Sequence, residues 1–445
     1  MSWLALRRRV EPLDALAALA AAPVARGDRF YLERPEACEA RVGLGAAARV
    51  TASGAARFRV ADCRSAALLA RLEVAGDPGP AASGPQVLGG FAFADAPGCG
   101  AWAGFDTASL VLPELLLVRR GNACWLTAIG PHSGSRESTL AGLDARLACW
   151  QREVRRWGLH RESGPPAGPA LEHRIHPDEA PGAFATRVKR ALEDVACGEL
   201  EKVVVARAVT LSRDGGYRPI ELLRALRGSL PSCASYLVRR GDAVLFGATP
   251  ERLLRRRGRL VTTAAVAGTA PRGRSPERDR RLGRDLLESK KEQAEHAVVL
   301  RFLLERLGRR AHAVRAREAP QLLKLDGLQH LCSPVAAELA RSVGVLELAG
   351  DLHPTPATGG APEPAARQWL ARHERLDRGW YAGPLGWRDS DGDGDLWVAL
   401  RAGLARDDAL HLFAGAGIVA GSDPADELRE TRLKLGTLLQ PALEI

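Results

Sequence analysis

The stretch Leu410–Leu435, LHLFAGAGIVAGSDPADELRETRLKL, is the segment around which the rest of the chain is organised. Alternating apolar residues from Leu410 to Ala414 predict a strand. Gly415 and Gly417 then predict a glycine turn, where the missing side chains let backbone N–H groups approach a ligand closely. The Ser-Asp-Pro sequence at 422–424 predicts the start of a helix, with Ser or Asp as the N-cap and Pro in the first turn.

One face of this helix carries Glu427, Glu430, Thr431 and Lys434, because these residues are spaced i, i+3, i+4 and i+7. Two carboxylates and an ammonium beside a glycine turn could bind a cation and an anionic ligand together. The alternative is a solvated helix face with an intrahelical Glu–Lys pair, and this stretch alone favours that alternative. Partner residues elsewhere in the chain must decide between the two interpretations.

The composition is that of a soluble globular protein with a basic surface. The chain has 445 residues, 63 Lys and Arg against 53 Asp and Glu, and a formal net charge of +10. Its basic runs, such as Arg7–Arg9 and Arg255–Arg257, are short and lack the interleaved aromatics of a nucleic-acid platform. We therefore expect no nucleic-acid partner. No apolar run is long enough to cross a membrane, so no membrane association is expected either.

The eight cysteines, spread from Cys38 to Cys332, include no CxxC pair. A structural zinc site and a disulfide framework are therefore not expected, and we predict a cytoplasmic protein. At the N-terminus, Arg7–Arg9 and the apolar segment after it superficially resemble a signal peptide. Glu11 and Asp14 interrupt the pattern, so an amphipathic first helix is expected instead.

Residues 1 to about 160 are predicted to form strands and turns with few helices. Apolar runs of β type occupy Arg26–Pro35, Ala40–Ala52 and Leu110–Leu126, whereas Arg136–Trp157 has the pattern of an amphipathic helix. The Pro- and Gly-rich segment Arg161–Glu172 is the best linker candidate. It could separate two domains or join two halves of one domain.

The second half of the chain is more regular. The predicted elements are helices at Pro181–Cys197, Tyr217–Leu230 and Ser275–Arg309, a strand at Lys202–Leu211, paired strands at Ala234–Gly247 and Arg252–Ala265, and a turn at Asp389–Asp395.

Four segments of this half place unusual polar residues in apolar settings. Lys202 stands at the start of the strand KVVVAR, where it is either a strand-end charge or a desolvated base. Glu251 follows Thr-Pro in FGATPERL, and it either pairs with a nearby arginine or serves as a buried proton donor. Glu292 and Glu295 are spaced i, i+3 on a predicted helix. Arg401 lies in the apolar strand WVALRAGL, where a buried arginine needs an anion.

Each of these residues has a structural alternative, but together they suit one kind of enzyme. The pair Glu292 and Glu295 matches the pair Glu427 and Glu430, and four carboxylates from two helices could bind Mg²⁺ through oxygen ligands. Arg401 and other cations could hold anionic groups. The set therefore predicts a Mg²⁺-assisted enzyme that acts on a small, multiply carboxylated substrate.

Nine segments resemble, in this order, the chorismate-utilising enzyme family: KVVVAR, FGATPERL, AVAGTAPRG, SKKEQAEH, QHLCSPV, LHPTPATGG, WYAGPLGW, LFAGAGIV and DELRETRLKL. The resemblance is strong over Pro181–Ile445, and GGFAF at Gly89–Phe93 resembles isochorismate synthases in particular. It implies an α+β fold of two packed, mostly antiparallel β-sheets with helices outside and the site between the sheet layers. The linker would then join a divergent half (1–165) to a chorismate-binding catalytic half (175–445) of one domain, 1–445.

The resemblance also implies a role for each matching residue. Lys202 would activate water as the base, and Glu251 would protonate the departing C4 hydroxyl of chorismate. Water would add at C2 as the ring double bonds shift, which gives isochorismate. The implied cofactor is Mg²⁺, with Glu292, Glu295, Glu427 and Glu430 as direct or water-mediated ligands. The implied substrate-binding positions are Gly268, His330, Ala357, Tyr381, Arg401, the Gly415 backbone N–H and Lys434.

Three positions distinguish the subfamilies that the chain resembles. Ammonia-using anthranilate-type synthases usually have glutamine where Lys202 stands, and no obligatory amidotransferase subunit is expected. Aminodeoxychorismate synthases carry a nucleophilic lysine at the position of Ala267. Salicylate synthases, which go on to eliminate pyruvate, tend to have threonine at Ala357, although Thr358 is the next residue. Isochorismate synthase is therefore preferred, with salicylate synthase as the alternative and a non-catalytic or nucleic-acid-binding relative as the alternative of a different class.

Overall fold

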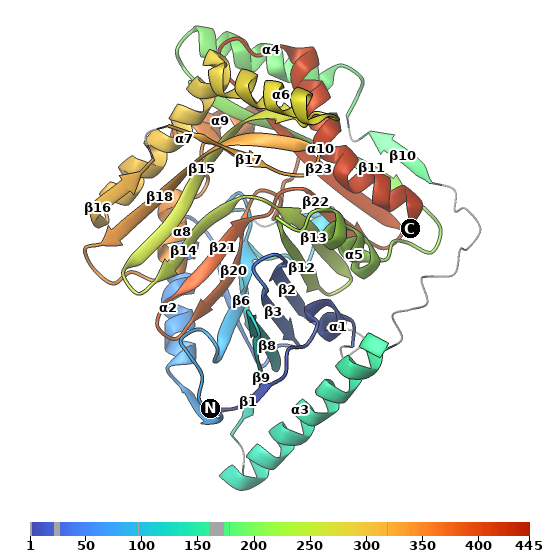
Figure 1. Ribbon diagram of the computed structural model, residues 1–445, viewed down its shortest axis with the longest axis vertical. Coiled ribbons are helices and arrows are strands. Elements are labelled where there is room, and N and C mark those ends of the chain that lie inside the picture. The colour runs from blue at the N-terminus through green and yellow to red at the C-terminus, as the bar shows by residue number, and fades with distance from the viewer. Residues whose placement is uncertain are drawn as a thin grey trace.

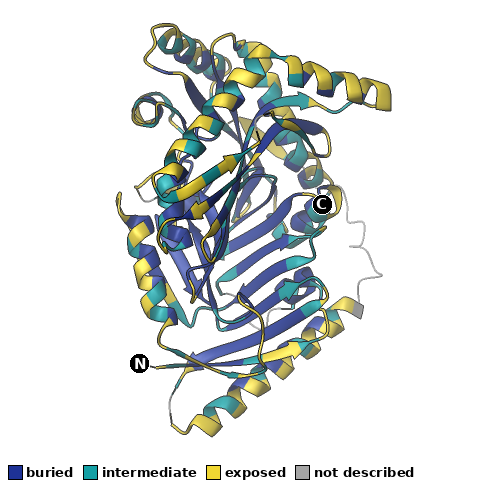
Figure 2. Cartoon of the chain, turned by 60° about the vertical axis from the view of Figure 1, so that its left-hand side comes forward, coloured by how far each residue is buried: buried dark blue, intermediate teal, exposed yellow. Residues whose placement is uncertain are grey.

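The computed structural model describes residues 2–21, 27–96, 98–132, 134–159, 173–177, 179–317 and 319–445. Two large, mostly antiparallel sheets form its centre, and helices pack around them (Figure 1). Most strand residues are buried, whereas the helices expose their outer faces (Figure 2). The predicted α+β class, with two packed sheets and helices outside, is therefore confirmed. The linker predicted at 161–172 lies outside the described residues.

The first sheet, sheet A, has thirteen strands and draws on both halves of the chain. In spatial order they are β10 (Arg174–Pro177), β11 (Lys202–Ser212), β23 (Ala409–Ile418), β22 (Ala402–Arg406), β13 (Ala243–Thr249), β12 (Ala234–Arg240), β2 (Arg29–Arg34), β3 (Glu39–Leu44), β8 (Leu115–Arg120), β9 (Ala123–Pro131), β1 (Trp3–Val10) and β5 (Leu72–Gly76), with β19 (Gly360–Ala361) also paired to β11. β2 pairs with β12, so backbone hydrogen bonds join the two halves of the chain here.

The second sheet, sheet B, has ten strands. They are β16 (Ala311–Ala316), β18 (Leu328–Leu339), β15 (Leu260–Pro271), β14 (Arg252–Arg257), β21 (Gly394–Val398), β20 (Pro384–Asp389), β6 (Gln86–Phe91), β7 (Ala108–Leu112) and β4 (Ala48–Ala52), with β17 (Gln321–Lys324) paired to β18. β6 pairs with β20, which joins the two halves a second time. The single-domain organisation over 1–445 stays a prediction.

The helices cover the outer faces of the sheets (Figure 1). They are α1 (Ala15–Ala20), α2 (Arg57–Leu69), α3 (Arg136–Leu159), α4 (Ala183–Ala196), α5 (Pro219–Ser229), α6 (Pro276–Glu288), α7 (Lys290–Gly308), α8 (Val345–Leu352), α9 (Glu363–His373) and α10 (Pro424–Glu444), with a short 3₁₀ turn at Gly100–Trp102. α7 packs on β15, and α10 packs on β23. Among the described helices, none has both the length and the apolar character needed to span a bilayer.

The main core lies between the sheets and includes buried side chains from both, such as Leu245 of sheet A and Leu254 of sheet B. A second core lies on the outer face of sheet A, where Leu16, Trp150 and Leu438 come from three different helices. Each fully buried leucine contributes on the order of 2 kcal/mol through removal of its apolar surface from water. The two cores together hold α10 and α7 firmly at the upper end of the sheets.

Three predictions of local structure are wrong in detail. Gly415 and Gly417 belong to strand β23 and pair with β11, and the turn comes later, at Gly421, where φ is +85°. The predicted helix Ser275–Arg309 is two helices, because Ser289 adopts an extended conformation and caps α7 by accepting a hydrogen bond from the Glu292 N–H. The N-terminal segment forms strand β1 and a short helix α1 with five buried residues, not an amphipathic helix.

The predicted pairing of Ala234–Gly247 with Arg252–Ala265 is also wrong. The first segment contains the hairpin β12–β13 in sheet A, and the second contains the hairpin β14–β15 in sheet B. Each has its own turn glycine with positive φ, Gly241 in the first and Gly258 in the second. The chain therefore crosses from one sheet to the other between the hairpins, at the Pro250–Glu251 dipeptide.

Candidate active site

Residues of both sheets, α7 and α10 line one cavity of about 850 Å³, a volume that includes its open mouth. Eleven of the thirteen predicted site residues line it: Lys202, Glu251, Gly268, Glu295, His330, Ala357, Tyr381, Arg401, Gly415, Glu430 and Lys434. Glu292 and Glu427 lie behind this lining. Residues more than 230 positions apart in the sequence, Lys202 and Lys434, thus line the same cavity, where β11 and β23 face β15 and β18.

Lys202 is the first residue of β11 and is 1% exposed. Its Nζ lies 2.7 Å from Oε1 of Glu295 on α7, and this ion pair compensates for the burial of the ammonium. The alternative of a strand-end surface charge is therefore wrong. The pair places a nitrogen base candidate in the cavity wall at a fixed position.

Gly417 of β23 lies directly against this ion pair. A Cβ atom at this position would lie 2.5 Å from Oε1 of Glu295 and 2.9 Å from Cε of Lys202. Both distances are shorter than van der Waals contact allows. Glycine is therefore required at position 417 because the Lys202 and Glu295 side chains lie close to the strand backbone, and not because the chain turns there.

We expect Gly417→Ala to lower turnover by on the order of tenfold or more, because the new methyl group displaces Lys202 and Glu295 from their paired positions. Steady-state kinetics with chorismate, the substrate that the family resemblance implies, would measure the effect. Gly436→Ala on α10 is the matched control, since a Cβ atom there meets no other atom within 4 Å. Unchanged turnover in Gly417→Ala would show that the position of the ion pair is not important.

Glu251 lies in the crossover between the sheets and is 7% exposed. Burial raises the pKa of its carboxyl to about 7, although the nearby Lys202 and Lys434 ammonium groups act in the opposite direction. Its backbone is fixed at both ends: the Glu251 N–H donates to Oγ1 of Thr249 at 3.2 Å, and Val398 N–H donates to the Glu251 carbonyl at 3.0 Å. Glu251 is therefore a buried carboxylic acid that carries a proton over part of the neutral pH range.

The carboxylates of α7 and α10 lie near one another. Oε2 of Glu292 accepts a hydrogen bond from the Thr269 N–H at 2.9 Å. A bulge at Gly268 in β15 directs this N–H, and a Cβ atom on Gly268 would lie 3.1 Å from Oε2 of Glu292. Burial raises the pKa of Glu292, with neighbouring Glu295 and Glu430 contributing, and burial and Glu430 raise that of Glu427.

All four of these carboxylates lie within ion-pair distance of a lysine, with Lys291 Nζ at 3.8 Å from Oε1 of Glu292 the longest contact. Lys202 pairs with Glu295, Lys434 Nζ lies 2.6 Å from Oε1 of Glu430, and Lys291 Nζ lies 2.9 Å from Oε1 of Glu427. In this arrangement, no group of three or more His, Cys, Asp or Glu residues in the described chain is close enough to hold a metal ion. The candidate metal ligands are all carboxylate oxygens, the ligand type that Mg²⁺ prefers. Their negative charges repel one another, and a bound cation would offset this repulsion.

Three further predicted residues, Arg401, His330 and Tyr381, also line the cavity. Arg401 is 7% exposed, has a φ of +46°, and forms no ion pair within the described residues. Burial lowers the pKa of His330 to about 3, so this ring is neutral, and its Nδ1 lies 3.1 Å from Oγ1 of Thr269. The Tyr381 ring stacks on Phe413 at 5.2 Å. A buried, unpaired guanidinium beside a neutral imidazole is suited to bind an anionic group.

Lys434 does not point freely into the cavity. Its Nζ donates to the Gly415 carbonyl at 2.9 Å as well as to Glu430. Burial acts to lower the pKa of Lys434, but the ion pair with Glu430, with Tyr381 and Glu295 nearby, raises it overall. Lys434 therefore remains charged and contributes positive potential to the cavity.

Two contributors escaped the sequence analysis. Lys291 lies beside Glu292 in the SKKEQAEH segment, and its contact with Glu427 could not be found without the fold. Arg378 lines the cavity and donates to the carbonyls of Val204 at 2.7 Å and Thr358 at 2.8 Å. Its buried ion pair with Glu374 has i, i+4 spacing, and this spacing is the signal that could have identified it.

Comparison with known proteins places this geometry in a family. The family model described as chorismate binding enzyme matches residues 2–443. The salicylate biosynthesis isochorismate synthase of Pseudomonas aeruginosa is 36% identical over 96% of this chain and 88% of its own length. Isochorismate synthase MenF of Bacillus subtilis is 32% identical over 80% of this chain and 74% of its own.

A solved structure agrees with these relatives. MenF, the menaquinone-specific isochorismate synthase from Escherichia coli, superposes with a TM-score of 0.77 at 27% identity, covering 98% of this chain and 95% of that chain. Anthranilate synthase component I from Streptococcus pneumoniae, at 21% identity and a TM-score of 0.70, shares the fold. The matched residues include every position that lines the cavity, and this protein belongs to the chorismate binding enzyme family.

Proposed function

We propose that this protein is an isochorismate synthase, an isomerase that converts chorismate to isochorismate. The observation that carries the proposal is that Lys202, on a strand of sheet A, and Glu251, in the crossover between the sheets, line the same cavity. Relatives named isochorismate synthase support it over most of the chain. A base and an acid are both required, because water is a poor nucleophile and hydroxide a poor leaving group.

In the proposed reaction, the Lys202 side-chain nitrogen accepts a proton from the attacking water while the water oxygen bonds to C2 of chorismate. The ring double bonds shift, and the bond from C4 to its hydroxyl breaks as Glu251 donates its proton to that oxygen. One water enters and one leaves, so the product is an isomer of the substrate. Arg401 and the positive potential of Lys434 are placed to bind the substrate carboxylates.

Mg²⁺ is the proposed cofactor. Glu292, Glu295, Glu427 and Glu430 would hold it, and the bound ion would supply positive charge for a substrate carboxylate. Lys291 and Lys202 now neutralise two of these carboxylates, so a bound cation would compete with their ammonium groups. The proposed cytoplasmic location and the lack of an amidotransferase partner fit an enzyme that uses water, not ammonia.

The experiment is incubation of the purified protein with chorismate and Mg²⁺, followed by chromatography of the products. Isochorismate is the expected product, and EDTA is expected to stop its formation until excess Mg²⁺ is added. Full activity in EDTA would contradict the proposed cofactor. Salicylate with pyruvate as the main product would favour the alternative, a salicylate synthase, for which Thr358 in the cavity wall beside Ala357 is the motivating observation.

A further inference from the structure

Two short crossovers carry the chain between the sheets beside the active-site cavity. Residues 250–251 run from β13 in sheet A to β14 in sheet B, and residues 399–401 run from β21 in sheet B back to β22 in sheet A. The crossovers lie side by side, because the Val398 N–H donates to the Glu251 carbonyl at 3.0 Å. The proposed acid and the cavity arginine Arg401 therefore stand on neighbouring crossovers.

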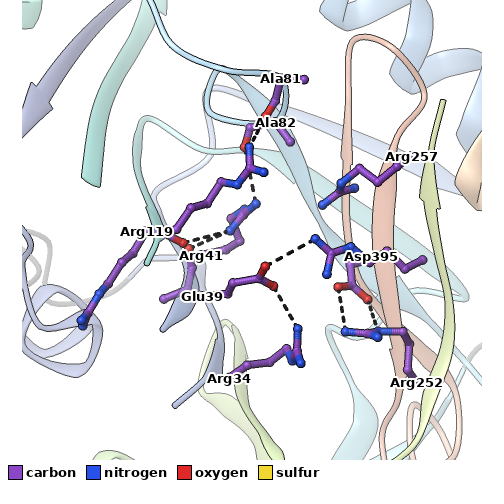
Figure 3. Close-up of polar contacts among 12 residues, drawn as sticks. Arg34, Glu39, Arg41, Ala81, Ala82, Arg119, Arg252, Arg257 and Asp395 are labelled. Atoms are coloured by element: carbon purple, nitrogen blue, oxygen red, sulfur yellow. Dashed lines mark hydrogen bonds and ion pairs between the residues drawn. The ribbon is translucent and has the colours of Figure 1, made fainter. Parts of the chain in front are cut away.

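Both ends of this pair of crossovers are fixed. At the sheet B end, Arg252 of β14 forms an ion pair with Asp395 of β21 at 2.9 Å (Figure 3). At the sheet A end, Gly247 of β13 and Ala402 of β22 are partners in the ladder of hydrogen bonds. The conformation of the few residues between these ends then decides where the Arg401 side chain lies.

Arg401 adopts a backbone conformation that is unfavourable for arginine. Its φ of +46° lies in the left-handed region, where the Cβ atom of an L-residue comes too close to a backbone carbonyl. The chain turns sharply just before it, since the Leu400 N–H donates to the Val398 carbonyl at 2.8 Å. Nη1 of Arg401 contacts Sγ of Cys233 at 3.9 Å, and a thiol is a weak acceptor. A strained residue of this kind persists only where surrounding contacts hold it in place.

Tyr236 of β12 supplies a contact that holds the strained residue. Its side chain is fully buried, and its hydroxyl donates to the Leu400 carbonyl at 2.9 Å. The Leu400 carbonyl and the Arg401 N–H belong to one peptide plane, and rotation of that plane changes φ of Arg401. Rotation towards an ordinary φ would carry the carbonyl away from the hydroxyl. The hydrogen bond therefore opposes relaxation of Arg401.

A glycine in the neighbouring strand makes room for this contact. Gly247 is the register partner of Tyr236. A Cβ atom on Gly247 would lie 2.6 Å from the Tyr236 hydroxyl oxygen and 2.3 Å from the Arg401 carbonyl oxygen. Both distances are shorter than van der Waals contact allows. The tyrosine hydroxyl and the Arg401 backbone thus meet at a place where β13 has no side chain.

We propose that Tyr236 is a positioning residue for substrate binding, because it holds Arg401 in the strained conformation that presents its guanidinium to a carboxylate of chorismate. The inference rests on the proposed function, in which Arg401 binds that carboxylate. Tyr236 is not among the described residues that line the cavity, so it acts on the substrate through Arg401.

The test is the steady-state kinetics of Tyr236→Phe with chorismate and Mg²⁺. KM is expected to rise about five- to tenfold, the size of one net hydrogen bond. We expect kcat to change by less than about twofold, because Arg401 would hold substrate and transition state alike. The matched control is Tyr31→Phe, which removes another fully buried hydroxyl from the adjacent strand β2. Tyr31 donates to Glu33, so its variant should lower Tm without changing KM.

A double-mutant cycle tests whether Tyr236 acts through Arg401. Arg401→Gln alone should raise KM more than Tyr236→Phe does, and addition of Tyr236→Phe to Arg401→Gln should raise KM no further. The inference is overturned if Tyr236→Phe raises KM by the same factor in both backgrounds. It is also overturned if Tyr236→Phe leaves KM unchanged or lowers kcat alone.

A second variant disturbs the same contact without removing the hydroxyl. Gly247→Ala places a methyl group against Tyr236 and the Arg401 carbonyl, and it should also raise KM. Its control is Gly228→Ala on α5, where a Cβ atom meets no other atom within 4 Å. Unchanged KM in Gly247→Ala would contradict the inference. Circular dichroism and Tm of each variant ensure that the kinetics compare folded proteins.

The outcome is separable from that of the proposed function. If the wild type forms no isochorismate, the proposed function fails, and the same variants are compared by their Kd for chorismate. This Kd is obtained from the rise in Tm with chorismate concentration. Binding about five- to tenfold weaker in Tyr236→Phe, with unchanged binding in Tyr31→Phe, would support the positioning role. Equal Kd values in the wild type and Tyr236→Phe would overturn it.

Discussion

Replacing Lys202 with methionine is expected to lower kcat for isochorismate formation by about 10²–10⁴-fold. Methionine has nearly the length of lysine but has no nitrogen to accept a proton from water. KM for chorismate is expected to change much less, because Arg401 and Lys434, the cations proposed to hold the substrate carboxylates, are unaltered in this variant. A large fall in kcat with little change in KM would identify Lys202 as a group that acts in the chemical step.

A loss of activity could also arise from disruption of the buried ion pair, so the charge must be tested separately. Lys202→Arg keeps a cation beside Glu295, whose carboxylate lies 2.7 Å from the lysine nitrogen. Arginine does not release its proton at accessible pH and cannot act as a base. We therefore expect Lys202→Arg to fold and remain inactive, whereas the exposed control Lys189→Met should be fully active. Near-wild-type turnover in Lys202→Arg would remove Lys202 from the role of base.

Local sequence patterns predicted several elements of the fold correctly. The helix predicted at Arg136–Trp157 is α3 within two residues, and the strand predicted at Lys202–Leu211 is β11 within one. Both segments have a regular apolar period that their burial then follows. Together with Arg401, the segments resembling the family supplied eleven residues that line one cavity, although these residues lie in ten different elements and loops.

What local patterns could not supply is the contact between distant segments. Gly415 and Gly417 were interpreted as a turn because glycine favours turns, but β23 continues through them so that Lys202 and Glu295 can approach its backbone. Lys291 looked like one more surface lysine until α7 and α10 brought it to Glu427. Arg255–Arg257 was treated as one short basic run, because the Trp387 ring that Arg257 stacks on and the Glu39 carboxylate that pairs with Arg255 come from other strands.

Replacing Glu251 with glutamine is expected to lower kcat by about 10²–10⁴-fold, because the amide keeps the shape of the side chain but cannot give a proton to the departing hydroxyl. In the wild type, burial raises the pKa of Glu251 to about 7, and the reaction needs the protonated form. We therefore expect kcat/KM of the wild type to fall as pH rises above about 7. A pH–rate profile from 5 to 9 would show this fall in kcat/KM. If the residual activity of Glu251→Gln falls over the same pH range, the fall belongs to another group.

The same substitution is expected to stabilise the protein at alkaline pH. Between the ordinary pKa of 4.5 and about 7, the folded state retains the Glu251 proton that the unfolded state has released. Stability of the wild type therefore falls as pH rises through this window, by about 3 kcal/mol in total for a shift of this size. Glutamine does not ionise and avoids the loss. Tm of Glu251→Gln should exceed that of the wild type at pH 8, and the difference should shrink towards pH 4.5.

That pH dependence separates a functional acid from a residue that merely fits its pocket. A glutamate kept for packing or for an ion pair would leave the variant equally or less stable at pH 8, with activity largely retained. A variant that is inactive yet more stable above pH 7 shows that burial of Glu251 costs stability and supplies a proton donor. Thr249→Val, which removes the hydroxyl that accepts from the Glu251 N–H, tests the loop without changing the acid. It should lower Tm at every pH by a similar amount.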